Sequence, residues 1–161
     1  MNRETKRLRL YFAAALLLAS ALTFPALAAM KSLAVVTAAG SKVQDVPLAE
    51  LVKMCKGTQK AWSDGKSFTL VMKDPEAPDM HVAVQKLFGM APADLKASLA
   101  KLNESRQVLK VVESDEELLR TVQATPGAAG IVDVYAINSA VKVLRVDGKL
   151  PFDVGYVLKG N

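Results

Sequence analysis

The feature that most constrains the fold of this chain is the alternation of short apolar runs with segments of helical periodicity. Residues 33–37 (LAVVT) and 67–72 (SFTLVM) are apolar and contain β-branched residues, a pattern typical of strands buried on both faces. Segments of roughly ten residues with apolar positions three and four apart come between such runs. Strands that alternate with helices favour an α/β domain in which helices cover both faces of one sheet.

The first two predicted helices have recognisable start and stop residues. One spans 48–56 and ends at Gly57, because four regularly spaced apolar side chains share one of its faces: Leu48, Leu51, Val52 and Cys55. The second begins after Asp79, whose carboxylate is expected to cap the first turn, and it runs through Leu87 to a stop at Gly89. Both helices therefore have a defined length and one apolar face.

Two further helices are predicted from their first residues. Pro92 is favourable at a first helical position and opens a helix that continues through Leu102. Ser114 and Glu117 have the spacing of a capping box, which predicts a helix that reaches Ala124. The acidic residues after Ser114 also place negative charge at the positive end of that helix dipole.

The remaining strands are predicted from short apolar runs between turn signals. They are expected at 108–112, 130–137, 141–146 and 155–158, whereas the polar segment 38–47 is expected to be a loop. These strands would complete the sheet that the first two begin.

The first 28 residues have the three parts of a secretory signal peptide. A basic start (1–9) precedes an apolar run (10–24), and the small-residue triplet Ala26-Leu27-Ala28 follows Pro25. The apolar run is about fifteen residues, shorter than the roughly 20 that a transmembrane helix needs, although an uncleaved anchor is the alternative. We therefore assign 1–28 to a signal peptide and 29–161 to one domain.

The domain that remains has little net charge and few reactive side chains. Its 133 residues carry 17 basic and 15 acidic side chains without a basic cluster, which excludes the electrostatic pattern of nucleic-acid binding. Cys55 and His81 are the single cysteine and the single histidine of the chain, so an internal disulfide framework and two-histidine chemistry are excluded. No catalytic constellation is apparent, and we expect neither an enzyme nor a cofactor.

Three stretches together resemble one family. They are LAELVKMCKGTQKAWSDG (48–65), FTLVMKDPEAPD continuing to Leu87-Phe88-Gly89 (68–89), and SDEELLRTVQATPGAAGIV (114–132), which is the most specific. These stretches are similar to the solute-binding proteins of phosphate ABC importers, and especially to their short single-lobe relatives. The resemblance implies a single lobe of a type 2 periplasmic-binding-protein-like fold, with a mixed sheet flanked by helices. It also implies a non-catalytic binding protein of the periplasm.

Several residues in these stretches have a structural explanation. Trp62 beside a turn is expected to be a packing anchor rather than a platform for a ligand. Pro126 and Gly127 end a helix and let the chain re-enter the sheet. Gly130 keeps the next strand slim, so that a neighbouring helix can approach it. These features predict fold rather than function.

The resemblance also implies a ligand site in the loop after the second strand. In phosphate-binding members an Arg, followed by Ser, Gly and Thr at a helix N-terminus, surrounds the anion with donors. Here Lys73 stands at the Arg position, where it cannot form a bidentate fork, and residues such as Ala77 and Asp79 stand at the hydroxyl positions. The predicted ligand contacts are Lys73, Asp74, Ala77 and Asp79, and the expected ligand is phosphate or another small oxyanion.

The acidic character of this loop supports an alternative. Asp74, Glu76 and Asp79 oppose a bound phosphate, and two prolines in the loop remove backbone donors. In the alternative, the scaffold has lost its ligand and acts as an interaction or sensing accessory in the periplasm. It would dock through this loop to a membrane transporter or sensor protein, and it would meet the membrane itself only through its transient signal peptide.

Three sharper hypotheses concern single side chains or small clusters. A cation could be held by four side chains of one segment: Asp74, Glu76, Asp79 and His81. Their spacing matches no calcium loop, so we expect no metal site. Met80 beside His81 could bind copper, but methionines are more often core filler. Cys55 could be a reactive thiol, but its place on an apolar helix face predicts burial instead.

Overall fold

The computed structural model of the protein describes residues 31–160, so the predicted signal peptide lies outside the described residues. Within this range, no helix has the length and apolar character needed to cross a membrane. The elements in chain order are β1 (Leu33–Ala38), β2 (Asp45–Val46), α2 (Leu48–Cys55), β3 (Thr69–Met72), α3 (His81–Phe88), α4 (Pro92–Leu102), β4 (Leu109–Val111), α5 (Asp115–Ala124), β5 (Ala128–Asp133), η1 (Val134–Ala136), β6 (Val141–Val143) and β7 (Arg145–Val146).

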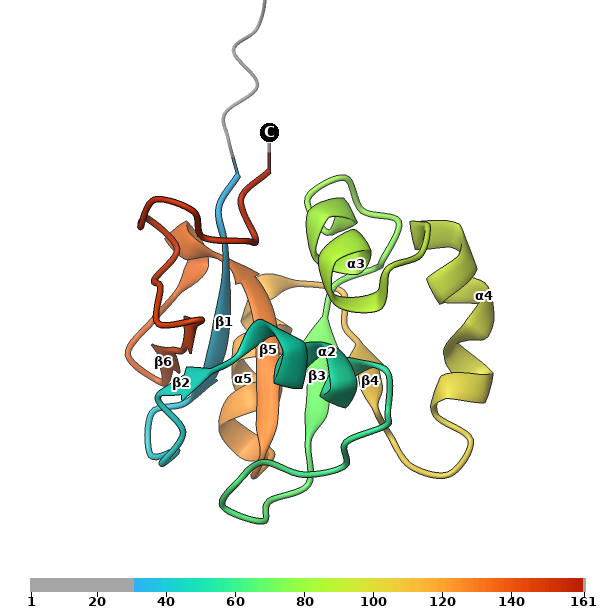
Figure 1. The fold of residues 1–161 in the computed structure, drawn as a ribbon, viewed down its shortest axis with the longest axis horizontal. Coiled ribbons are helices and arrows are strands. Elements are labelled where there is room, and N and C mark those ends of the chain that lie inside the picture. Colours follow the sequence, from blue (N-terminus) through green and yellow to red (C-terminus); the bar gives the residue numbers. More distant parts are fainter. Residues whose placement is uncertain (1–30, 161) are drawn as a thin grey trace, which may run out of the picture.

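The described strands form one mixed sheet and one small ladder. The sheet has five strands in the order β4-β3-β5-β1-β6 (Figure 1), and β3 runs parallel to both β4 and β5. β1 is antiparallel to both of its neighbours, with Leu33 opposite Asp133 in β5 and Val36 opposite Val143 in β6. β2 and β7 pair in parallel beside this sheet. The predicted mixed sheet is confirmed.

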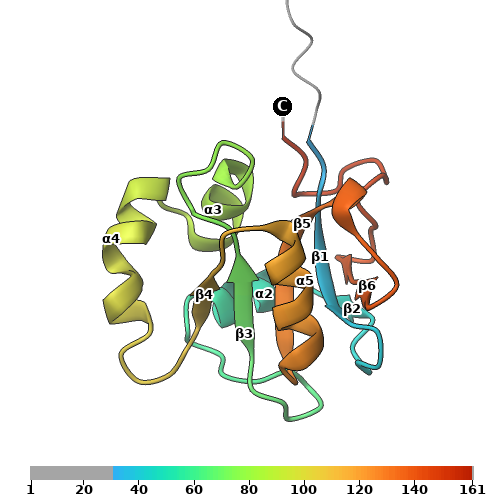
Figure 2. The ribbon, with the colours of Figure 1, turned by 180° about the vertical axis from the view of Figure 1, so that it is seen from behind.

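Helices cover both faces of the sheet, as the alternation of elements predicted. One face carries Leu33, Val35, Leu70 and Ile131 and packs against α2, α3 and α4. Side chains from the other face, such as Val36, pack against α5, which lies behind the sheet in Figure 1 and in front of it in Figure 2. Strands buried on both faces explain the continuous apolar runs in the sequence.

The close approach of α5 to the sheet depends on a glycine. A Cβ atom at Gly130 in β5 would lie 2.6 Å from Leu118 Cδ2 and 2.9 Å from Val122 Cγ2. Both neighbours belong to α5 and are buried, so a side chain at this position would push the helix away from the sheet. The expectation that Gly130 leaves room for a helix is confirmed.

The predicted helix boundaries hold at three helices and fail at the start of one. Pro92 occupies the first turn of α4, and the Ser114 hydroxyl accepts a hydrogen bond from the Glu117 amide at 3.2 Å. The prediction that Asp79 caps α3 is wrong. The N-cap is Met80, which makes no side-chain cap bond, and the Asp79 carboxylate instead pairs with Lys73. A charged partner within reach outcompetes the backbone amides for that carboxylate.

The predictions for the late strands need correction. β5 begins at Ala128, which pairs with Thr69, and it ends at Asp133, so residues 134–136 form a turn of 3-10 helix rather than the end of a strand. The Asp133 carboxylate accepts a hydrogen bond from the Tyr135 amide, and this local bond competes with further strand pairing.

The predicted strand 141–146 divides into β6 and β7 because the chain changes pairing partner at Leu144. The Leu144 amide donates to Val35 in β1, whereas the next amide donates to Gln44, just before β2. The segment 38–47 therefore contains a short strand, although it was predicted to be a loop. Residues 155–158 do not form the predicted strand, and the next residue, Lys159, makes an isolated bridge to Ser32 at the start of the described chain.

Candidate functional site

The candidate site lies at one edge of the sheet, where three parallel strands reach their carboxyl ends. Lys73 directly follows β3, Asp115 opens α5 after β4, and Asp133 is the last residue of β5. Together with Lys31, Asp79, Tyr135 and Ala136 these residues line a hollow of about 320 Å³. The crevice outside the carboxyl ends of strands is the usual position of ligands in open α/β sheets. We call this hollow the carboxyl-edge site.

Lys73 is the central cation of this site and is already paired. Its Nζ lies 2.7 Å from Asp79 Oδ2 and 3.1 Å from Asp115 Oδ1. Partial burial lowers the pKa of Lys73, but the hydrogen bonds and charges of Asp79 and Asp115 outweigh it, so the pKa lies above its ordinary value. Lys73 therefore stays charged and occupied by carboxylates of its own chain.

The surroundings of Asp79 and Asp115 are electrostatically favourable for their carboxylates. Partial burial raises the pKa of Asp79, but the hydrogen bond and the charge of Lys73 outweigh it, so the pKa lies below its ordinary value. Asp115 lies in the first turn of α5, where the helix dipole favours negative charge. With Asp133 the hollow has three carboxylates against two lysines, and any anion that enters it must compete with them.

The other charged residues of the predicted loop form a separate group on the surface. The Nζ atom of Lys96 in α4 lies 2.9 Å from Asp74 Oδ2 and 2.6 Å from Glu76 Oε2. The hydrogen bonds that Lys96 donates to the carboxylates of Glu76 and Asp74 raise its pKa to about 12. The pKa of Asp74 is lowered, first by the hydrogen bond from the Glu76 amide and then by Lys96. This group ties the loop to α4.

The side chains of the metal hypothesis are consequently divided among different partners. Asp79 faces Lys73, Asp74 and Glu76 face Lys96, and His81 Nε2 lies 3.0 Å from the Glu76 carbonyl oxygen. Among residues 31–160 no group of three or more His, Cys, Asp and Glu side chains could hold a metal ion. For the copper hypothesis, Met80 is buried in the core whereas His81 is exposed.

Of the four predicted ligand contacts, the structure places two at the carboxyl-edge site. Lys73 and Asp79 line it, Asp74 lies on the surface beside Lys96, and Ala77 is partly buried against the core. The other lining side chains come from distant parts of the sequence: Lys31, Asp115, Asp133 and Tyr135. A signal was available for Asp115, which follows the strand predicted at 108–112 and so was expected near the carboxyl end of a parallel strand. Asp133 lies inside the strand predicted at 130–137, and only the structure shows that β5 ends there.

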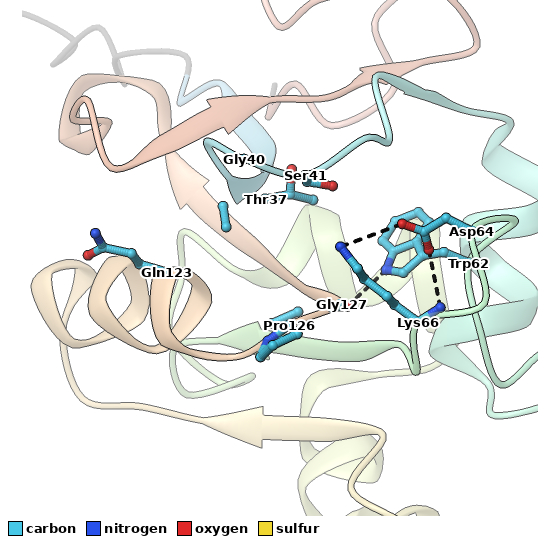
Figure 3. A pocket seen from close by; sticks show the side chains of 11 residues that line it. Thr37, Gly40, Ser41, Trp62, Asp64, Lys66, Gln123, Pro126 and Gly127 are labelled. Atoms are coloured by element: carbon cyan, nitrogen blue, oxygen red, sulfur yellow. Dashed lines mark hydrogen bonds and ion pairs between the residues drawn. The ribbon is translucent and has the colours of Figure 1, made fainter.

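The residues of the sequence resemblance meet at the opposite edge. Trp62 Nε1 donates a hydrogen bond of 2.8 Å to the Gly127 carbonyl oxygen, and the Trp62 ring meets Phe68 edge-on with centroids 5.2 Å apart. Figure 3 shows Trp62, Pro126 and Gly127 around a smaller hollow of about 180 Å³. Only 5% of Trp62 is exposed, so its predicted role as a packing anchor is confirmed.

At this edge, position 127 accepts only glycine. It has φ +83°, and a Cβ atom there would overlap the Ser67 carbonyl oxygen. We call Trp62, Ser67, Phe68 and Gly127 the amino-edge lock, because they join the segment before β3 to the start of β5. The predicted role of Gly127 in returning the chain to the sheet is confirmed.

The thiol of Cys55 lies in the core. Cys55 is the last residue of α2 and is fully buried, and this burial raises the pKa of its thiol far above the ordinary value. The thiolate, which is the reactive form, is therefore disfavoured. The predicted burial is confirmed.

The fold defines the class of protein to which the chain is similar: a mixed sheet with helices on both faces, as in one lobe of a periplasmic binding protein. An ABC-type phosphate transport receptor from Vibrio cholerae matches 81% of this chain and 54% of its own, with a TM-score of 0.66 and 14% identity. A putative phosphate ABC transporter substrate-binding protein from Clostridium perfringens, with bound phosphate, matches 76% of this chain and 47% of its own, with a TM-score of 0.60 and 15% identity.

In sequence, the chain is similar to Phosphate-binding protein PstS 2 of Streptococcus agalactiae. The two are 30% identical over 87 residues, which is 54% of this chain and 29% of that protein. The chain therefore spans less than a third of the length of this curated relative and about half of the solved structures. No family model matches the chain. The expected resemblance to substrate-binding proteins of phosphate ABC transporters is confirmed.

Proposed function

We propose that this chain is an exported, non-catalytic solute-binding protein of the phosphate-importer type, acting in the periplasm after residues 1–28 are removed. Its ligand is phosphate or another small oxyanion, and its protein partner is a membrane transporter. The observation that carries the proposal is the position of Lys73 at the carboxyl end of β3, beside Lys31, in a fold shared with proteins named for binding phosphate.

The arrangement around Lys73 determines how such a ligand would bind. The lysine is held by Asp79 and Asp115, so an anion gains its charge only by displacing one of these carboxylates. Asp133 lines the same hollow and adds repulsion. Binding is therefore expected to be weak in the natural chain and stronger when the competing carboxylates are neutralised.

A second candidate is favoured by the same ion pairs. Because two carboxylates of the chain already occupy Lys73, the scaffold can keep its charge balance with no ligand. In this candidate the protein is an interaction or sensing accessory. The exposed surface formed by Asp74, Glu76 and Lys96 would then contact a transporter or sensor protein.

Calorimetric titration with phosphate and sulfate separates the two candidates. The solute-binding proposal predicts that the double variant Asp79→Asn/Asp115→Asn binds phosphate at least about tenfold more tightly than the natural chain, because two competing charges are removed. Lys73→Gln in the natural background should abolish the response. Folding without any response to either anion, in the natural chain and in the double variant alike, contradicts the proposal and favours the accessory role.

A further inference from the structure

A second hollow shares no lining residue with the carboxyl-edge site and has the opposite charge balance. It has a volume of about 330 Å³ and lies where the C-terminal ends of α2 and α4 meet the loop before β4. Its polar lining comprises four cations and two hydroxyls: Lys56, Lys60, Lys101, Arg106, Ser98 and Ser105. No acidic side chain lines it. Within residues 31–160, none of the four cations forms an ion pair with a carboxylate.

The guanidinium of Arg106 is fixed at this hollow before any ligand arrives. Its Nη1 donates to the Phe68 carbonyl oxygen at 2.7 Å, and its Nη2 donates to the Gln59 carbonyl oxygen at 3.3 Å. These bonds use two of the five donors of the side chain, and the others stay available. A planar donor group held in place loses little freedom when it binds the oxygens of an anion.

Helix dipoles explain only part of this concentration of charge. Lys56 is the C-cap of α2 and Lys101 lies in the last turn of α4, so both complement the negative ends of their helices. Each helix end amounts to roughly half a negative charge, about one in total, against four cations. Lys60 and Arg106 lie in loops and complement neither helix, so a net positive charge remains.

We propose that this hollow, which we call the basic hollow, binds a small polyanion that carries phosphoryl groups. Several cations around one volume favour a ligand with more than one negative charge. The fixed guanidinium and the Ser105 hydroxyl are donors suited to phosphoryl oxygens. This inference goes beyond the proposed function, because it concerns a different surface and does not involve Lys73.

The test is calorimetric titration of the purified chain with inorganic pyrophosphate at low ionic strength. The natural chain should bind, and the double variant Lys60→Gln/Lys101→Gln should bind at least about tenfold more weakly. Both lysines are exposed, so the double variant should fold. The matched control is Lys86→Gln, which removes an exposed lysine of α3 outside this hollow and should leave the affinity unchanged.

Further arms of this experiment test the chemistry and the location. Arg106→Lys keeps the positive charge but loses the planar group that can donate two hydrogen bonds side by side. This variant should therefore bind pyrophosphate more weakly than the natural chain. Lys73→Gln should leave pyrophosphate binding intact, whatever its effect on phosphate. The proposal is overturned if the natural chain does not bind pyrophosphate at millimolar concentration, or if the Lys60→Gln/Lys101→Gln variant binds it with equal affinity. It is also overturned if Lys73→Gln loses pyrophosphate binding, or if citrate binds more tightly than pyrophosphate.

Discussion

The two edges of the sheet are held together by different forces. At the amino edge, the lock consists of an indole N–H bonded to a carbonyl, an edge-on aromatic pair and a glycine against a neighbouring backbone. At the carboxyl edge, Lys73 is held between Asp79 and Asp115, and these side chains remain partly accessible to water. One edge depends on shape, whereas the other depends on charge.

This difference separates what the sequence resemblance reports about scaffold from what it reports about ligand. Trp62 and Gly127, which belong to the most recognisable stretches, serve the amino-edge lock and touch no part of the carboxyl-edge site. The loop after β3 carries Lys73 and Asp79 at positions where the phosphate-binding pattern has other residues. Similarity can therefore persist in the scaffold while the chemistry of the ligand site changes.

The largest expected effect is at the amino edge. Gly127→Ala should lower the free energy of unfolding by about 3 kcal/mol or more, because it combines a left-handed backbone with an overlap against Ser67. Gly65→Ala is the matched control: it has the same φ of +83° but open space around it, and should cost about 1 kcal/mol. Urea denaturation measures both. Equal losses would show that the close approach to Ser67 contributes nothing.

A smaller loss is expected from Trp62→Phe, which keeps an aromatic ring but removes the donor to the Gly127 carbonyl. The free energy of unfolding should fall by about 2 kcal/mol, from lost volume and an unpaired carbonyl. Circular dichroism should follow this unfolding, because the chain has a single tryptophan and the variant loses its fluorescence. A loss below about 0.5 kcal/mol would show that this hydrogen bond contributes little to the stability of the amino-edge lock.

At the carboxyl edge, Lys73→Met should lower the free energy of unfolding by about 1–2 kcal/mol at neutral pH, because two carboxylates lose their partner. Lys96→Met is the control. It removes an equally connected but exposed lysine, and its denaturation midpoint should match that of the natural chain. If the two variants lose equal stability, partial burial does not distinguish the two ion-pair groups.

The free energies of unfolding of the natural chain and of Lys73→Met should depend differently on pH. The pKa of folded Asp79 is depressed, so its stabilisation is present above its unfolded pKa of about 3.9 and is lost as pH falls through the folded value. The pKa of folded Lys73 is raised, so its contribution is lost only as pH rises through that folded value, above about 10.4. The stability gap between the natural chain and Lys73→Met should thus narrow in strong acid and in strong base.

Much of the scaffold could be predicted from the sequence because local signals agree with the tertiary structure. The helices ending at Gly57 and Gly89, and the one opened by Ser114, are bounded by residues whose local chemistry sets the boundary. The late strands could not be placed in this way. β6 and β7 are separate because Leu144 and Arg145 bond to different partners, and this choice depends on the position of β2.

The candidate site was only partly predictable for the same reason. Lys73 and Asp79 are close in sequence and were identified, but Asp115 joins them from a helix more than thirty residues later. The basic hollow could not be predicted from the sequence. Its cations are distributed over two helix ends and two loops, so no short window of sequence contains them.

The burial of Cys55 has a practical consequence for studying this protein. The only thiol of the chain belongs to the last residue of α2 and is fully buried in the core, so a thiol reagent can reach it only when the end of that helix separates from the core. The labelling rate under native conditions therefore reports how often the core opens, without denaturant and without an introduced cysteine. A ligand that binds the closed protein should slow that labelling, whichever surface it occupies.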